Sequence, residues 1–129
     1  MDEKELAGWK KQLASGKGYA QASCNFAELV WAGNVSQRQQ VDLLQSDDVN
    51  VRRAVSWAVA DLARDDEAMR HLIRECFNDA DSIVRLNAWW AISQAVWLSQ
   101  QDKERLIERL GDEQDARVLK QIRAITAQE

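Results

Sequence analysis

The chain contains no proline and only five glycines in 129 residues. Because these two residue types interrupt helices most strongly, their scarcity permits helices almost everywhere. No stretch approaches about 18 consecutive apolar residues, and the first residues are charged and amphipathic, unlike a leader peptide. We therefore expect an all-α, soluble, cytoplasmic protein with no membrane partner.

Residues that commonly bind metals or catalyse reactions are also scarce. There are two cysteines, Cys24 and Cys76, without a C-x-x-C spacing, and one histidine, His71. We expect both cysteines to be buried, reduced thiols and His71 to lie on a helix surface. The chain has no glycine-rich phosphate loop, G-x-S-x-G motif or H-E-x-x-H motif. The sequence therefore predicts no catalytic site, no metal site and no cofactor.

What the sequence does contain is an internal repeat. Residues 47–63, DDVNVRRAVSWAVADLA, return as residues 79–96, DADSIVRLNAWWAISQAV, with Val51 aligned to Val84 and Trp57 to Trp90 at an offset of 33 residues. A fixed offset in this range is typical of stacked helix pairs. The acidic loop, the Val-Arg step and the alanine-rich helix resemble the HEAT-type repeat. The resemblance implies a short right-handed α-solenoid.

Apolar periodicity and capping signals predict eight helices. The first is expected from Glu3 to Ala14, Ser36 begins a capping box before the third, and Gly111 is expected to end the seventh. Acidic residues at 47–48, at Asp65–Asp66 and at 79–81 are expected to break the chain before the fourth, fifth and sixth helices and to cap them. We expect one domain, residues 1–129, with four HEAT-like helix pairs at approximately 2–33, 36–64, 65–98 and 99–127.

Acidic and basic residues recur four positions apart at the start of the second helix of a pair. The pairs are Asp48 with Arg52, Asp81 with Arg85 and, less regularly, Glu113 with Arg117. The resemblance implies a charge ladder that bridges neighbouring repeats, which we favour. Pairing within one helix is the minimal alternative. A row of three arginines for a phosphate or carboxylate ligand is the functional alternative.

Six tryptophans in a chain of this length are unusual. At about 100° per residue, Trp57 and Trp90 share one flank of their helices, and the same offset relates Trp97 to Trp31 through position 64. The resemblance places such second helices on a concave surface. Two interpretations stay open: the indoles wedge between repeats, or they form an exposed aromatic groove, with Trp89 and Trp97 the most exposed. The candidate partner-binding residues are Trp31, Arg53, Trp57, Asp61, Arg64, Trp89, Trp90 and Trp97.

The leading functional hypothesis is a non-enzymatic protein-protein interaction module, an adaptor or an immunity-type inhibitor, that binds a protein or peptide on its concave face. The first alternative is a nucleic-acid-binding protein similar to the HEAT-like proteins that recognise alkylated DNA. The net charge of the chain, −4, argues against a nucleic acid as partner. The second alternative is a bilin-lyase-like HEAT protein with a tetrapyrrole in the tryptophan groove. A homo-oligomer formed through Trp9 or the last helix also stays open. The basic residues available for DNA would be Arg105, Arg109, Arg117, Lys120 and Arg123.

Overall fold

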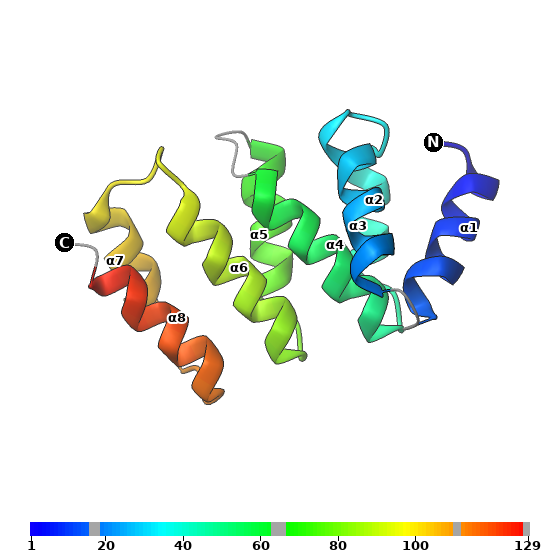
Figure 1. The fold of residues 1–129 in the computed structure, drawn as a ribbon. Coiled ribbons are helices and arrows are strands. Elements are labelled where there is room, and N and C mark those ends of the chain that lie inside the picture. The colour runs from blue at the N-terminus through cyan, green and yellow to red at the C-terminus, as the bar shows by residue number, and fades with distance from the viewer. Residues whose placement is uncertain (16–18, 63–66, 110–111, 128–129) are drawn as a thin grey trace.

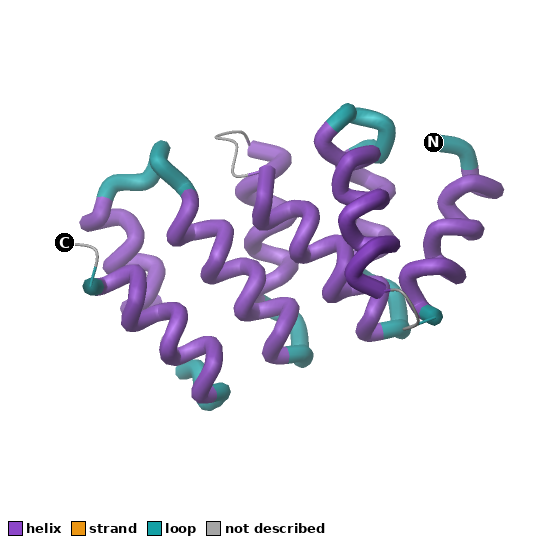
Figure 2. Tube along the Cα trace, in the orientation of Figure 1, coloured by secondary structure: helices purple, strands orange, loops and turns teal. Residues whose placement is uncertain are grey.

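The structure is a computed structural model that describes residues 1–15, 19–62, 67–109 and 112–127, with backbone alone at 19–20, 61–62 and 67–69. Within these residues it contains eight α-helices and no strand (Figure 1; Figure 2). The all-α prediction is therefore confirmed. The helices are α1 (Glu3–Ala14), α2 (Tyr19–Trp31), α3 (Gln37–Leu44), α4 (Val49–Leu62), α5 (Glu67–Phe77), α6 (Ser82–Gln94), α7 (Gln100–Arg109) and α8 (Ala116–Thr126).

The helices stack in two layers, as an α-solenoid does. Helices α2, α4, α6 and α8 pack side by side and form what we call the even-helix layer. Helices α1, α3, α5 and α7 form the odd-helix layer, each packed on the even helix that follows it (Figure 1). The two termini lie at opposite ends of the array. None of the helices that the structure describes is long and apolar enough to cross a membrane.

Side-chain caps set the helix starts where the sequence predicts them. Ser36 and Gln39 form the expected capping box at the start of α3. Asp48 and Asp81 accept backbone N–H groups at the starts of α4 and α6. Gly33, with a φ of 81°, ends α2 in the left-handed conformation that favours glycine. The predicted cap at Asp65–Asp66 and the stop at Gly111 lie outside the described residues.

The repeated apolar positions form the core between the layers. Val51 and Val84 are buried on α4 and α6, and Val118 occupies the matching position on α8. Alanines beside them, such as Ala58 and Ala91, are also buried. Small side chains let neighbouring even helices approach closely, while the valines fill the space toward the odd helices. The 33-residue repeat in the sequence therefore reflects the repeated packing of helix pairs in the core.

The cysteine prediction is correct for one residue and wrong for the other. Cys76 is buried, and its burial raises the pKa of the thiol to about 12. Cys24 is exposed on α2. On α2, Cys24 precedes Trp57 by the repeat offset, so it occupies the flank of the helix that α4 and α6 use for their tryptophans. That flank faces away from the core, which explains the exposure.

Candidate functional site

The even-helix layer carries a row of tryptophans on the side that faces away from the odd-helix layer. Trp31 on α2 and Trp90 on α6 are 42% and 41% exposed, and Trp57 on α4 lies half-buried between them. The rings of Trp31 and Trp57 are 6.5 Å apart. On α6, Ile92 contacts the odd-helix side and lies about 200° from Trp90 around the helix, which places the tryptophans on the opposite face. We call this surface the tryptophan face.

Hydrogen bonds fix two parts of the tryptophan face. The Trp31 indole N–H donates to the Ala58 carbonyl oxygen at 3.2 Å, so this ring is held across α2 and α4. The Asn87 amide donates to the Ser56 hydroxyl oxygen at 2.8 Å and so ties α6 to α4. Indoles with one edge bonded and one face open lose little freedom on binding, which favours them as anchors for a partner.

A shallow groove of about 220 Å³ lies on the tryptophan face between α4, α6 and α8. Trp57 and Trp90 form its aromatic walls, Leu86 adds apolar surface, and Asn87 and Gln121 supply the polar groups. Such a mixture of aromatic surface and amide groups suits a polypeptide, because a peptide offers both apolar side chains and backbone hydrogen-bonding groups. The groove is too small to enclose a large ligand and fits one or two side chains.

The structure contradicts the expectation that Trp89 is exposed. Trp89 is 2% exposed and packs edge-on against Phe77 with ring centroids 4.9 Å apart. On α6 the buried positions extend over a wide arc, because this helix contacts α4 and α8 on its flanks and α5 behind it. Trp89 lies about 140° from Val84 around the helix, which is at the edge of this arc but still within it. Trp89 is therefore a core residue, as its neighbour Ala88 is.

Trp97 also lies away from the tryptophan face. Helix α6 ends at Gln94, and Ala95 has an extended backbone with φ −77° and ψ 91°, so the helical phase does not continue to residue 97. Trp97 is half-buried, and the Arg70 guanidinium of α5 lies 5.2 Å from its ring centroid. This is a cation-π contact on the odd-helix layer. Trp31, Trp57 and Trp90 are therefore the tryptophans that the fold brings together on one face.

Of the charged residues predicted beside the groove, Arg53 is described with its side chain. Arg53 donates two hydrogen bonds to the Asp81 carboxylate, at 3.0 and 2.8 Å, across the α4–α6 contact. The hydrogen bond from Arg53 is the main reason that the pKa of Asp81 lies below its ordinary value. The side chain of Asp61 and all of Arg64 lie outside the described residues.

Arginines bridge neighbouring repeats, as the favoured interpretation predicts. Arg52 pairs with Asp79 at 2.9 Å, and Arg85 pairs with Glu113 at 2.8 Å, so each guanidinium on an even helix reaches the loop before the next even helix. Each arginine also donates to backbone carbonyl oxygens in the loop that precedes its own helix, for example from Arg85 to the Asp79 carbonyl oxygen at 3.0 Å. Because their N–H donors are engaged in this way, these arginines hold neighbouring repeats together. They are therefore poorly placed to bind an anionic ligand.

The predicted third step of the ladder, Glu113 with Arg117, is wrong. The offset into the last repeat is 34 residues, so Asp115 and Val118 match Asp81 and Val84. The Asp115 carboxylate caps α8 and lies 3.6 Å from the Arg117 guanidinium. The position that corresponds to Arg85 is then Leu119, and the ladder has no arginine on α8.

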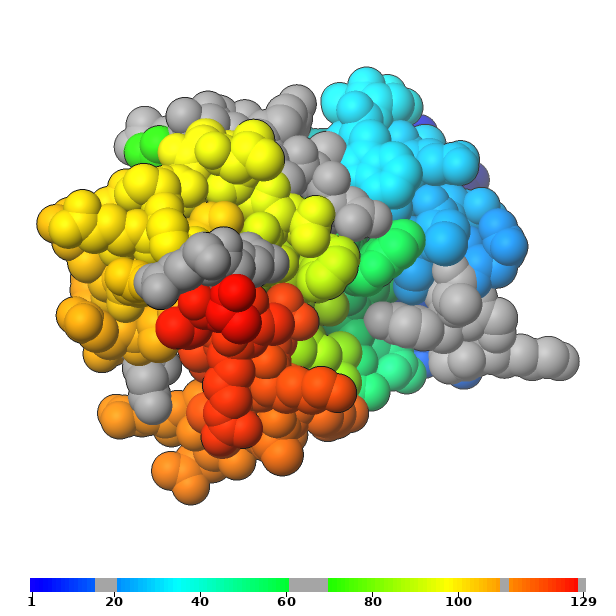
Figure 3. Space-filling view, turned by 60° about the vertical axis from the view of Figure 1, so that its left-hand side comes forward, coloured from blue at the N-terminus to red at the C-terminus, as the bar shows by residue number. Residues whose placement is uncertain are grey.

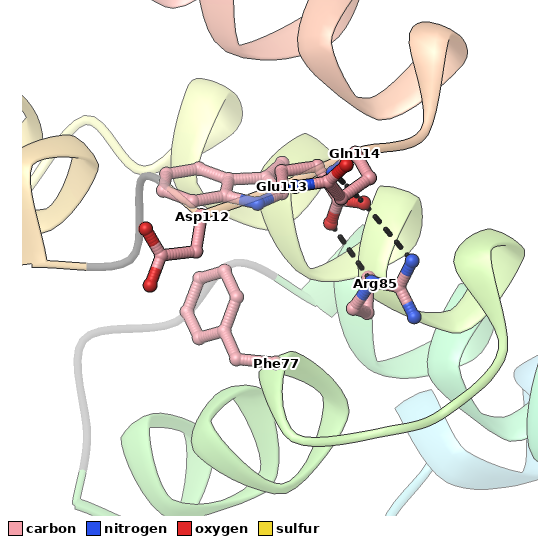
Figure 4. A pocket seen from close by; sticks show the side chains of 6 residues that line it. Phe77, Arg85, Asp112, Glu113 and Gln114 are labelled. Atoms are coloured by element: carbon pink, nitrogen blue, oxygen red, sulfur yellow. Dashed lines mark hydrogen bonds and ion pairs between the residues drawn. The ribbon is translucent and has the colours of Figure 1, made fainter.

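A pocket of about 260 Å³ lies at the loop end of the array, where the ladder meets the aromatic core (Figure 4). The Arg85–Glu113 pair forms one wall, and the rest of the lining comes from Phe77, Trp89, Asp112 and Gln114. The hydrogen bonds between Arg85 and Glu113 raise the pKa of the guanidinium and lower that of the carboxyl. Because Arg85 and Glu113 bond to each other, we interpret this pocket as a structural contact between repeats and not as a ligand site.

The residues that suggest chemistry are not assembled into a site in the described part of the chain. His71 is half-exposed on α5 and lies 4.0 Å from Glu75, one turn further on. Among the described residues there is no group of three or more His, Cys, Asp or Glu side chains that could hold a metal ion.

Sequence reasoning missed a second surface, a groove between α5 and α7 on the odd-helix layer. It has a volume of about 460 Å³ and is lined by Arg70, Arg74 and Arg109 together with Trp97 and several apolar residues. A signal for it was present in the sequence. Arg70 and Arg74 lie one turn apart on the amphipathic helix α5. Two like charges at this spacing weaken a helix slightly, so the pair indicates a role other than helix stability.

Comparison with known proteins supports the repeat. A family model for HEAT repeats matches residues 40–126, more than half of the chain. This range includes both well-defined repeats and extends through the last helix pair, where the arginine of the ladder is replaced. No curated protein and no solved structure matches the chain at a significant level.

Proposed function

Because the chain belongs to the HEAT-repeat family, we propose that it is a protein-interaction module that binds a protein or peptide partner through the tryptophan face, without a catalytic step of its own. Such a module would act as an adaptor between proteins or as an inhibitor of its partner. The two roles use the same contact surface and differ in what the bound partner is prevented from doing.

The observation that carries this proposal is the pair of exposed indoles, Trp31 and Trp90, with Trp57 between them. Tryptophan is strongly favoured in protein interiors and in binding hot spots, so two indoles left about 40% exposed on one face are informative. The arginine ladder joins α4 and α6, which carry Trp57 and Trp90, and the Trp31 indole is held on α4 by its hydrogen bond to the Ala58 carbonyl oxygen. A rigid row of aromatic side chains reduces the entropy lost on binding.

The test is affinity purification from cells of the source with three baits: the wild-type chain, the double variant Trp31→Ala/Trp90→Ala, and Trp9→Ala on α1. The third is the matched control, because it removes an indole from the odd-helix layer. Circular dichroism first establishes that each bait is folded. We expect a partner that co-purifies with the wild type and with Trp9→Ala and is lost from the double variant.

Measured affinities of the wild type and the double variant for the purified partner then show how much binding free energy the two indoles contribute. A hot-spot tryptophan contributes about 2 kcal/mol or more, so we expect the double variant to bind at least about 30-fold more weakly. Equal recovery by the wild type and the folded double variant would contradict the proposal. Loss from Trp9→Ala alone would also contradict it and would direct attention to the odd-helix layer.

A further inference from the structure

The groove between α5 and α7 is a second candidate surface, distinct from the tryptophan face. Its floor is apolar, formed by Ile73 of α5, Ile92 of α6 and Leu106 of α7. Trp97, in the connection between α6 and α7, closes one side. Figure 3 shows α5 (green) meeting this connection (yellow) at the surface. With a volume of about 460 Å³, the groove is twice as large as the one on the tryptophan face.

The groove exists because the odd-helix layer is incompletely packed at this point. Helix α5 packs against α3, its predecessor in the layer, but α7 makes its main contact with α8. The Trp97 indole of the α6–α7 connection stacks with the Arg70 guanidinium of α5, and this pair lines the space between α5 and α7. Ile73 and Ile92 on the floor are buried, so the open apolar surface of the groove comes from other lining residues. Leu98 and Leu106 are only half-buried.

The rim of the groove is positively charged although the chain as a whole carries −4. Three arginines line it, and the one carboxylate among the lining residues, Asp102, lies 3.5 Å from the Arg105 guanidinium. Arg74 and Arg109 are exposed and form no ion pair with any described residue. The only described partner of the Arg74 guanidinium is the Arg70 carbonyl oxygen, at 3.4 Å.

We propose that the α5–α7 groove binds an acidic peptide segment of a partner protein, with an apolar side chain on the floor and carboxylates on Arg74 and Arg109. Guanidinium groups bind carboxylates in a planar, two-point geometry, and an apolar floor favours a side chain that brings its own hydrophobic surface. An acidic amphipathic segment supplies both groups within a few residues. Helix-in-groove recognition uses the same combination.

The apolar floor and the surrounding charges favour a peptide over a nucleic acid. A nucleic acid needs a track of cations along its backbone, whereas here Glu108 stands beside Arg109 and Asp112 follows closely. The phosphate backbone also offers nothing to fill the space above Ile73 and Leu106. The cationic surface is therefore local, with the size of a short segment.

The test begins with a display library of random linear peptides, selected on the folded wild-type chain. The bound peptides are then synthesised with a fluorescent label, and their dissociation constants are measured by anisotropy. Two variants with the same change in charge are compared: Arg74→Glu/Arg109→Glu in the groove, and Arg38→Glu/Arg123→Glu at exposed positions on α3 and α8. All four positions are exposed, so each variant is expected to fold.

We expect selected peptides that carry at least two carboxylates near an apolar residue. Their affinity should fall at least about tenfold in Arg74→Glu/Arg109→Glu, stay within about twofold in the control, and weaken between about 50 and 300 mM salt as the charges are screened. The proposal is overturned if the selection yields no peptide or only neutral and basic ones. Equal loss in both variants, unchanged affinity in the groove variant, or tighter binding of a single-stranded oligonucleotide would also overturn it.

Discussion

At the scale of single residues, two adjacent tryptophans on α6 have opposite environments. Trp89 is 2% exposed and packs on Phe77, whereas Trp90 is 41% exposed on the tryptophan face. They differ by one position, which is about 100° around the helix and enough to move a side chain from the core to the surface. One contributes to the stability of the fold, and the other is available to a partner.

Substitution of each tryptophan by alanine should separate these roles. Trp89→Ala removes a large buried ring and should lower the free energy of unfolding by about 3–5 kcal/mol, because it leaves a cavity beside Phe77. Trp90→Ala should cost about 1 kcal/mol or less. Urea unfolding followed by circular dichroism measures both.

The milder change Trp89→Leu provides a second measurement if Trp89→Ala does not fold. It should still cost more than Trp90→Leu, since only the buried site leaves a gap. Equal costs at the two positions would show that the assignment of core and surface on α6 is wrong.

At the scale of elements, the sequence predicted all eight helices because each local signal agreed with the next. Caps such as Ser36 and Asp81 and the 33-residue repeat are local or nearly local features. The placement of Trp89 and Trp97 was not predictable in the same way. It depends on how many neighbours surround α6 and on where α6 ends, and Gln94–Leu98 contains no glycine or proline to mark that end. The gap between α5 and α7 is likewise a tertiary feature.

The ladder makes a prediction about pH. The pKa of Glu113 is lowered in the folded protein, mainly by hydrogen bonds from Arg85. A carboxyl with a depressed pKa contributes stability that is present above its unfolded pKa, about 4.3, and is lost as the pH falls through the folded value. Glu113→Gln should therefore lower the free energy of unfolding by about 1–3 kcal/mol at pH 7.

The difference between wild type and Glu113→Gln should shrink as the pH falls below about 4, since the wild-type carboxyl then becomes neutral as well. Chemical unfolding at a series of pH values measures it. The matched control is Glu108→Gln, an exposed carboxyl on α7 with no partner among the described residues. A constant difference across the pH range would mean that the Arg85–Glu113 bridge contributes no ionic stabilisation.

At the scale of the whole molecule, stability in a solenoid is a sum of contacts between neighbouring elements. Helices α4 and α6 lie in the middle of the even-helix layer and contact helices on both flanks and in the other layer. Helix α7 is the opposite case, since its main contact is α8 and its apolar residues Leu106 and Ile107 are only half-buried. Local opening should therefore be easiest at the C-terminal end of the odd-helix layer.

Hydrogen exchange tests this distribution of stability. We expect the backbone amides of α7 to exchange at least about tenfold faster than those of α4 and α6, because opening α7 disrupts few apolar contacts. Helix α5 is the matched comparison: it belongs to the same layer and has 11 residues against 10 in α7, but it packs on α3, α4 and α6. It should be better protected than α7. If α7 is as well protected as α6, its contacts are stronger than the packing indicates, and the groove beside it is a rigid feature of the fold.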